Sequence, residues 1–203
     1  MTYKREKYEN DLKNYLSEDV FKHTKRVATY SERLGKIIGL DQIEQEKLYV
    51  AGLFHDVGKQ MIKSNIWHKT DNLNRNEFEL VKKHPIKSYQ YMLDSEDIFL
   101  QDLSDIVKHH HENFDGSGYP SGLEKLDIPL LSRIIAVCDG FDAMTSKRSY
   151  RPFAYSEERA LKIIRDNKGI KYDPFIVESL ESNFNEFAGQ NRNRKKNAIH
   201  QAV

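Results

Sequence analysis

The sequence has a single cysteine, no long apolar run and almost no net charge. Cys138 cannot form a disulfide within the chain, which is typical of proteins in a reducing compartment. No stretch approaches the roughly 18 apolar residues that a membrane span requires. The first ten residues, MTYKREKYEN, lack the apolar segment of a signal peptide. We therefore expect a cytoplasmic protein without a membrane span, with Cys138 in its core.

The formal net charge of +1 excludes a global electrostatic field that would attract nucleic acid or an anionic membrane. We accordingly expect neither DNA nor RNA as a polymeric partner, and an anionic substrate would have to meet locally placed charges. The 203 residues are 38% hydrophobic and 31% charged, which suits one helical domain with a strongly solvated exterior.

Apolar residues recur at steps of three and four, which predicts an all-α fold. The predicted helices cover about residues 3–16, 17–38, the region after the Asp41 cap, 76–84, 86–94, 98–111, 130–144, 156–166 and the region from 174 onward. Pro85 separates the fourth and fifth of these helices, and residues 60–75 show no clear period, so we predict a loop there. We predict one compact domain over residues 17–187, a helix over residues 1–16 packed on it, and a basic, disordered tail over residues 188–203.

Histidines and carboxylates lie where these predicted helices face inward. His110 and His111 close the apolar face of the helix over 98–111, whereas His109 falls on its outward face and is expected to be solvated. His23 lies within a buried stripe, and His84 follows the inner face formed by Phe78, Leu80 and Val81. For each histidine alone, a structural role in the core is an equal or better interpretation than a metal ligand.

His55 and Asp56 end a mostly apolar helix, and Lys59 follows one turn later. Burying these groups would cost several kcal/mol if they stayed unpaired. One solution is a buried ion-pair network. The other is a cation held by His55 and Asp56, with Lys59 facing an anion.

The inward polar residues of five predicted helices share nitrogen and oxygen ligand chemistry. They are His23, His55, Asp56, His84, His110, His111 and Asp139. Seven ligands are too many for one tetrahedral zinc ion, but they suit two octahedral ions that share a bridging carboxylate, for which Asp56 is the candidate. The absence of thiolate favours iron or manganese. Asp19, four residues before His23, is a further candidate ligand, or the carboxylate that orients the His23 ring.

The order of these residues resembles the HD superfamily of metal phosphohydrolases. The segments HDVGK (55–59), HHENFDGSGYPSGL (110–123) and IPLLSRIIAVCDGFDAMTSKRSYR (128–151) are similar to motifs of the HD-GYP subfamily. With KYDPFIVESL (171–180), the resemblance covers about residues 20–182, within the predicted domain over 17–187. It implies an all-helical enzyme with a binuclear or trinuclear centre, usually of iron or manganese, that hydrolyses the bacterial second messenger cyclic di-GMP.

Carried over by position, the resemblance makes the seven inward residues metal ligands and places Asp19 where members with a third metal have a glutamate. It also implies that Lys59 lies beside the scissile phosphate. Gly118, Tyr119, Arg148 and Arg151 would hold the dinucleotide. The chain departs from the family at Met61-Ile62-Lys63, where members commonly read Ile-Pro-Asp, and at Arg148-Ser149-Tyr150, where they read Arg-Pro-Tyr.

The implied reaction is attack on phosphorus by a hydroxide that bridges the two metals, which lower the pKa of the bound water. Its product is linear pGpG, and a second cut would give GMP. One alternative keeps the metal site but changes the substrate to another cyclic dinucleotide, such as cyclic GMP-AMP, or to a nucleotide. Another is a silent module that binds a dinucleotide or a protein, although the complete ligand set favours activity. No receiver or sensor domain is expected, so regulation by a protein partner is left open, as is the oligomeric state.

Overall fold

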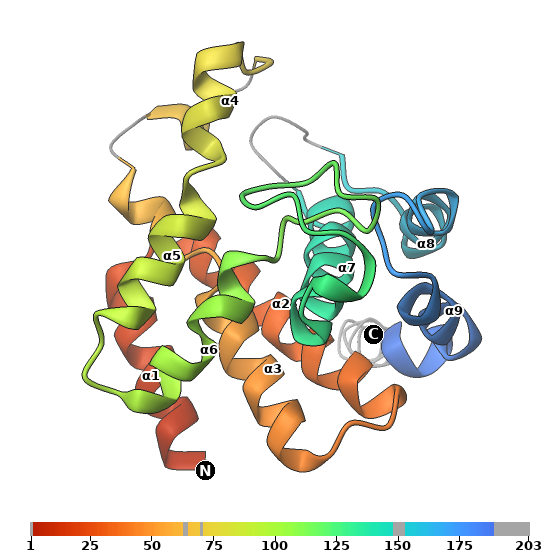
Figure 1. Ribbon diagram of the computed structural model, residues 1–203, viewed down its shortest axis with the longest axis horizontal. Coiled ribbons are helices and arrows are strands. Elements are labelled where there is room, and N and C mark those ends of the chain that lie inside the picture. Colours follow the sequence, from red (N-terminus) through yellow and green to blue (C-terminus); the bar gives the residue numbers. More distant parts are fainter. Residues whose placement is uncertain (1, 63–64, 70, 148–152, 189–203) are drawn as a thin grey trace, which may run out of the picture.

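The computed structural model describes residues 2–62, 65–69, 71–147 and 153–188, which form helices and no β-strand (Figure 1). The α-helices are α1 (Thr2–Tyr15), α2 (Glu18–Ile37), α3 (Gln42–Phe54), α4 (Arg75–Val81), α5 (His84–Leu93), α6 (Ile98–Lys108), α7 (Leu130–Thr145), α8 (Glu157–Asp166) and α9 (Pro174–Ser182). Three 3-10 helices lie between them: η1 (Val57–Met61), η2 (Asn65–His68) and η3 (Lys125–Asp127). The predicted all-α fold is confirmed.

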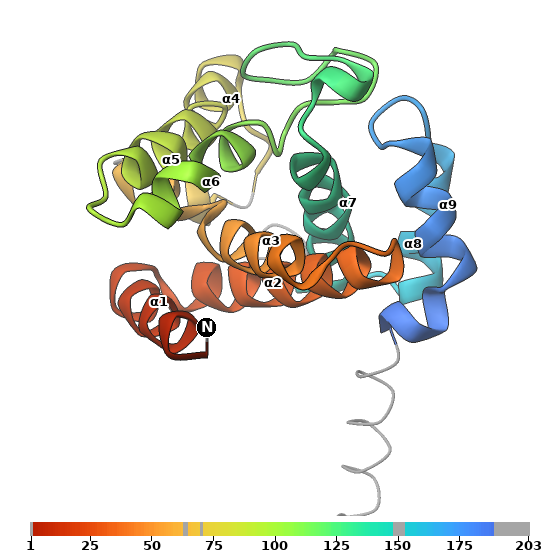
Figure 2. The same cartoon turned by 60° about the horizontal axis from the view of Figure 1, so that its bottom comes forward.

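Helices α2 and α3 pack against each other and form the centre of the fold. Helix α2 buries a stripe at helical spacing that includes His23, Val27 and Leu34, whereas α3 buries every residue from Leu48 to Phe54. Gly52 allows the close approach of the two helices, because a Cβ atom there would lie 2.8 Å from the Cα atom of Ala28. Figure 2 shows α1 near one end of this pair and α8 and α9 near the other.

Several helix ends follow the signals in the sequence. Gly39 ends α2 with a φ of +85°, a conformation that glycine adopts without strain. Asp41 caps α3, since its side chain accepts the N–H of Glu44 at 2.8 Å. We predicted that Pro85 separates two helices, but it lies within the first turn of α5, where its missing N–H costs nothing. Helix α5 therefore begins at His84.

The apolar core includes residues of α1, α2, α3, α5, α6, α7, α8 and α9. Cys138 is fully buried in it, as predicted, and α1 packs on it through Tyr8, Leu12 and Leu16. None of the described helices combines the length and the apolarity that a membrane crossing requires. Helices α2 and α7 also carry polar residues of the candidate site, and others follow the ends of α3 and α6.

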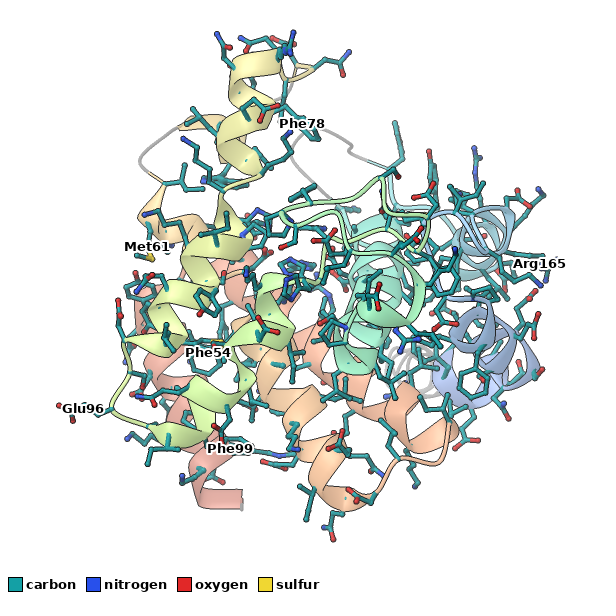
Figure 3. The ribbon with its side chains drawn as sticks, viewed as in Figure 1. Phe54, Met61, Phe78, Glu96, Phe99 and Arg165 are labelled. Carbon is teal, nitrogen blue, oxygen red and sulfur yellow. The ribbon has the colours of Figure 1, made fainter. Side chains whose placement is uncertain are left out.

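The predictions for residues 60–81 are partly wrong. Residues 60–75, predicted as a loop, contain η2 and the end of η1. The predicted inner face of the next helix is not buried, since Phe78 is 47% and Leu80 is 38% exposed. Helix α4 has only seven residues, buries none of them and projects from the body, as the position of Phe78 in Figure 3 shows. Periodicity alone could not reveal that this face stays largely exposed.

Candidate metal centre

The structure contains three overlapping groups of possible metal ligands. Within each group, the ligand atoms lie within 4.8 Å of one another. The groups are His84, His110 and His111; His23, His55 and Asp139; and His55, Asp56 and His110. Together they contain all seven residues that the sequence predicts as metal ligands. The Nε2 atom of His55 and the Oδ1 atom of Asp139 lie 3.9 Å apart, so the inward faces of separate helices converge on one point.

Asp56 lies in the middle of this cluster. Its Oδ1 atom is 3.2 Å from the Nε2 atom of His84, on the side of His110 and His111. Its Oδ2 atom is 3.4 Å from the Nε2 atoms of His23 and His55. Because one oxygen faces each half of the cluster, the geometry suits a carboxylate shared by two cations.

Three of the histidines are oriented by the same local hydrogen bond. The Nδ1 atoms of His55, His84 and His110 lie 2.7, 2.7 and 2.6 Å from the carbonyl oxygen three residues earlier. A carbonyl oxygen can only accept, so Nδ1 carries the proton and donates it. Each Nε2 atom therefore turns its lone pair toward the cluster, which is the arrangement that metal-binding histidines use.

Burial sets the protonation states of most of the cluster. It lowers the pKa of His84 to about 4 and that of His110 to about 3, and it holds the pKa of His111 well below its usual value. Burial raises the pKa of the carboxyl groups, but the charge of Lys59 lowers the pKa of Asp56 well below its usual value, and the hydrogen bond from His23 does the same for Asp139. Neutral imidazoles and ionised carboxylates are the forms that bind cations.

His23 is held by a carboxylate instead of a backbone carbonyl. Its Nδ1 atom lies 2.7 Å from the Oδ2 atom of Asp142, whose two oxygens also accept hydrogen bonds from Arg26. Burial lowers the pKa of His23, but hydrogen bonds to Asp139, Asp142 and Asp56 outweigh this effect and raise the pKa to about 9. We did not predict Asp142 or Arg26 as site residues, although Asp142 follows Asp139 by three residues and so lies one turn further along the same helix.

A close backbone contact between η1 and α5 fixes two parts of the cluster together. The Ser88 hydroxyl accepts the N–H of Gly58 at 2.9 Å and donates to the carbonyl of His55 at 2.8 Å. A Cβ atom at Gly58 would lie 2.4 Å from the carbonyl oxygen of His84 and from the N atom of Ser88. Gly58 and Ser88 therefore hold the His55 turn against the His84 turn, and neither was predicted as a site residue.

The loop after α6 folds back over the histidine pair. The ring of Tyr119 lies 5.0 Å from the ring of His111, and its N–H donates to the carbonyl of His111. Gly118 is required by packing, because a Cβ atom there would lie 2.2 Å from the N atom of Asn113. Tyr119 is thus beside the cluster, as a substrate-binding residue should be, whereas the structure shows a packing role for Gly118.

The prediction that His109 is solvated is wrong. His109 is only 5% exposed; its Nδ1 atom donates to the carbonyl of Asp105, and its Nε2 atom lies 3.3 Å from the Ser121 hydroxyl. Helix α6 ends at Lys108, so helical spacing no longer describes where the next side chain points. The buried carboxylate of Glu112 accepts the N–H of Ser121, which ties the same loop down.

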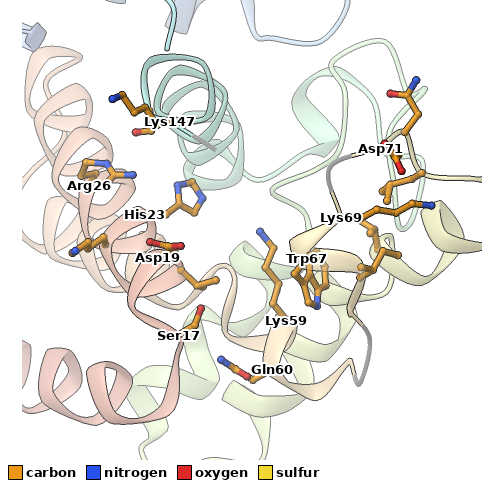
Figure 4. Close-up of a pocket in the computed structure, with 17 residues that line it drawn as sticks. Ser17, Asp19, His23, Arg26, Lys59, Gln60, Trp67, Lys69, Asp71 and Lys147 are labelled. Carbon is orange, nitrogen blue, oxygen red and sulfur yellow. The ribbon is translucent and has the colours of Figure 1, made fainter. Parts of the chain in front are cut away.

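A cavity of about 800 Å³ lies beside the cluster (Figure 4). Its lining includes His23, the indole of Trp67 and the cationic side chains of Lys22, Arg26, Lys59, Lys69 and Lys147. The Lys59 ammonium donates to Asp56 and lies 5.3 Å from the centre of the Trp67 ring. Positive charge next to a ligand cluster suits an anionic substrate.

The remaining predicted residues are not part of the cluster. Asp19 is exposed and lines the cavity, but it belongs to none of the three ligand groups. Arg148 and Arg151, predicted to hold the substrate, lie outside the residues that the structure describes. Their role stays a prediction.

Residues 10–176 match the HD domain family. The 3′3′-cGAMP-specific phosphodiesterase 2 of Vibrio cholerae is 36% identical over 84% of this chain and 33% of its own length. A cyclic di-GMP phosphodiesterase of Thermotoga maritima is 36% identical over 84% of this chain and 46% of its own length. The chain thus spans less than half the length of these relatives. An HDG"Y"P protein from Bdellovibrio bacteriovorus has the same fold, with a TM-score of 0.64 and 24% identity over 80% of this chain and 51% of that one.

Proposed function

This chain belongs to the HD domain family, as its resemblance to HD-GYP phosphohydrolases predicted, and on that basis we propose that it is a metal-dependent phosphodiesterase that hydrolyses cyclic di-GMP to linear pGpG. The observation that carries the proposal is the convergence of seven nitrogen and oxygen ligands beside a cationic cavity. A cyclic dinucleotide has two phosphodiester charges, which such a lining neutralises. The names of the two relatives support the substrate class.

We propose that the seven ligands hold two divalent cations, iron or manganese. The fit rests on two buried ligand atoms, His55 Nε2 and Asp56 Oδ1, which make no hydrogen bond to any described residue. Leaving them unsatisfied is costly, and a cation would satisfy both. Nitrogen and oxygen donors without thiolate suit these metals better than structural zinc. When bound, the cations supply Lewis acidity and an activated water. Asp19 stands outside this set because it is exposed.

Lys59 is the proposed ligand of the scissile phosphate. Its ammonium is fixed between the Asp56 carboxylate and the Trp67 ring, next to the ligand cluster. Negative charge builds up on the non-bridging oxygens as the phosphorus is attacked. A cation that is already in position stabilises this charge in the transition state, and the site does not have to rearrange to do so. The Tyr119 ring, beside His111, provides a wall for the dinucleotide.

The test is hydrolysis by purified protein loaded anaerobically with Mn²⁺ or Fe²⁺. The wild type should convert cyclic di-GMP to pGpG, which chromatography detects. Asp56→Asn should lower kcat/KM on the order of 10³-fold, because it removes the central ligand. Asp11→Asn, an equivalent change at an exposed position of α1, is the matched control and should act like the wild type. A metal-loaded wild type that leaves cyclic di-GMP intact would contradict the proposal.

The Vibrio cholerae relative gives a specific reason to test 3′3′-cGAMP as a second candidate substrate. Both dinucleotides present the same phosphodiester chemistry to the metal centre, so the ratio of the two kcat/KM values decides between them. A tenfold preference for 3′3′-cGAMP would replace the substrate and leave the metal centre unchanged. GMP after prolonged incubation would show a second cut. Well-folded protein that retains no metal yet binds a dinucleotide would indicate a silent binding module.

A further inference from the structure

Arg26 connects the cavity with the ligand His23. It lies on α2, three residues after His23, and lines the cavity with 41% of its side chain exposed (Figure 4). Its Nε and Nη2 atoms donate to the two oxygens of Asp142, at 2.5 and 3.0 Å. Its Nη1 atom makes no hydrogen bond to another described residue. One edge of the guanidinium is therefore occupied, and the other is available to a ligand.

Asp142 is shared between Arg26 and His23. It is only 1% exposed, and its Oδ2 atom accepts both the Nδ1–H of His23 and the Nη2–H of Arg26. A carboxylate held by two donors cannot rotate freely, so it fixes the plane of the His23 ring. The three histidines oriented by backbone carbonyls do not need such support. His23 thus differs from these three histidines, because its orientation depends on the side chain of Asp142.

We infer that Arg26 binds the second, non-scissile phosphate of the dinucleotide through its free edge and positions His23 through Asp142. This inference rests on the proposed function and deepens it. A guanidinium has donors on two edges, so it can hold a carboxylate on one and a phosphate on the other. Figure 4 shows Arg26 and Lys59 on different sides of the cavity, which allows each to take one phosphate of the same substrate. Arg26 thereby couples substrate binding to the geometry of a metal ligand.

The phosphate role is tested by the affinity of metal-free protein for cyclic di-GMP, measured by calorimetry in EDTA so that no hydrolysis occurs. Arg26→Gln should raise the Kd about 10- to 100-fold, because a charge-assisted hydrogen bond to phosphate is lost. Arg26→Lys keeps the charge but not the two-edged geometry, and it should raise the Kd less. Lys25→Gln is the matched control, since Lys25 is the neighbouring cation on α2, is exposed and pairs with Glu9. It should bind like the wild type.

The positioning role is tested without substrate, by titrating metal-free protein with Mn²⁺. Asp142→Asn should weaken metal binding about 10- to 100-fold, as is typical when the partner of a ligand histidine is lost. Arg26→Gln should weaken it less, because Asp142 remains. The visible spectrum of the Co²⁺-loaded protein should change in both variants, which a purely structural role elsewhere would not cause. Circular dichroism checks that each variant is folded.

Weaker dinucleotide binding in Arg26→Gln together with weaker metal binding in Asp142→Asn supports the inference. A wild-type Kd in Arg26→Gln overturns the phosphate role, and a wild-type metal affinity in Asp142→Asn overturns the positioning role. If Arg26→Gln does not fold, the affinities of Arg26→Lys for cyclic di-GMP and for Mn²⁺ decide instead. A wild type that binds cyclic di-GMP without cleaving it refutes the proposed activity alone, and one that does not bind it overturns both the substrate and the phosphate role.

Discussion

The candidate metal centre and a second polar cluster, which joins α1 to the rest of the fold, pair their polar side chains differently; the charged side chains of the second cluster are half-buried or exposed. The second cluster, here called the α1 cluster, consists of Arg5, Tyr8, Glu9, Lys25, Glu32, Glu46, Tyr49 and Asp97. Its donors meet acceptors within the chain: Arg5 donates to Glu46 and Glu32, and the Tyr8 hydroxyl donates to Asp97 at 2.6 Å. The Tyr49 hydroxyl and Lys25 both donate to Glu9.

In the metal centre, by contrast, His55 Nε2 and Asp56 Oδ1 are buried acceptors without a described donor. Neutral imidazoles turn their lone pairs toward each other, and the Nε2 atoms of His84 and His110 are 3.4 Å apart. Such an arrangement costs folding free energy unless something outside the chain satisfies it. The comparison suggests a rule: a polar cluster whose buried acceptors converge unpaired indicates a ligand, whereas one whose donors and acceptors match indicates a structural role.

The largest expected difference between the clusters is their response to metal. A metal at 100 times its Kd should stabilise the wild type by about 2.7 kcal/mol, because it binds the folded chain alone. For a chain of this size, that corresponds to a rise in Tm of about 5 to 10 °C. Asp56→Asn should lose this rise, since it removes the carboxylate between the two halves of the centre. Scanning calorimetry in EDTA and in Mn²⁺ measures both.

Tyr8→Phe in the α1 cluster provides the control for this measurement. It removes a hydroxyl that donates to Asp97 and should lower the free energy of unfolding by about 1 kcal/mol. The rise in Tm on adding metal should stay as in the wild type, because the α1 cluster contributes no ligand. If Tyr8→Phe also abolished the rise, the two clusters would not be independent.

Most of the fold could be predicted from the sequence because it depends on local periodicity, whereas the seven metal ligands stay a prediction, which the convergence of these side chains supports. The apolar spacing of α2 and α7 determines which side is buried, and His23 and Asp139 lie on those sides. Seven inward polar residues leave few interpretations other than a shared centre. Cap signals such as Asp41 then locate helix ends within one or two residues.

Contacts between distant segments could not be predicted in this way. Arg26 and Asp142 meet although they are 116 residues apart, and no local pattern indicates that one holds the other. His109 does not face outward as predicted, because α6 ends at Lys108 and not at residue 111. Phe78 has correct helical spacing but lies on a helix too short to pack its apolar face. Each failure arises where tertiary contacts, rather than spacing, decide the position of a side chain.

A smaller effect is expected from a substitution that disturbs the packing around the candidate metal centre and leaves its ligands in place. Gly58→Ala places a Cβ atom 2.4 Å from backbone atoms of His84 and Ser88, which cannot move aside as a flexible side chain could. We expect η1 and α5 to separate slightly, with a loss of about 2 kcal/mol in stability. Metal affinity should fall as well, because His55 and His84 move apart. Urea unfolding and Mn²⁺ titration give the two values.

Gly39→Ala is the matched control for this change. A Cβ atom at Gly39 meets nothing within 4 Å, but the φ of +85° strains any residue other than glycine. The variant should lose about 1 kcal/mol of stability, while its metal affinity should equal that of the wild type. Equal losses of metal affinity in both glycine variants would mean that general destabilisation, and not the contact between η1 and α5, weakens the centre.

The smallest expected effect concerns the pH dependence of the α1 cluster. Burial raises the pKa of Glu9, but hydrogen bonds from Lys25 and Tyr49 outweigh it and lower the pKa below its usual value. A carboxyl group whose pKa is lower in the folded state stabilises the fold above its unfolded-state pKa of about 4.3, and this stabilisation is lost as the pH falls through the folded-state value. Glu9→Gln should therefore be less stable than the wild type at pH 7, by about 0.5 kcal/mol, since the pair is partly solvated. Urea unfolding in EDTA, from pH 7 down to the acid limit of folding, should show this difference shrinking. A difference that stayed constant would mean that Glu9 contributes through packing and not through its charge.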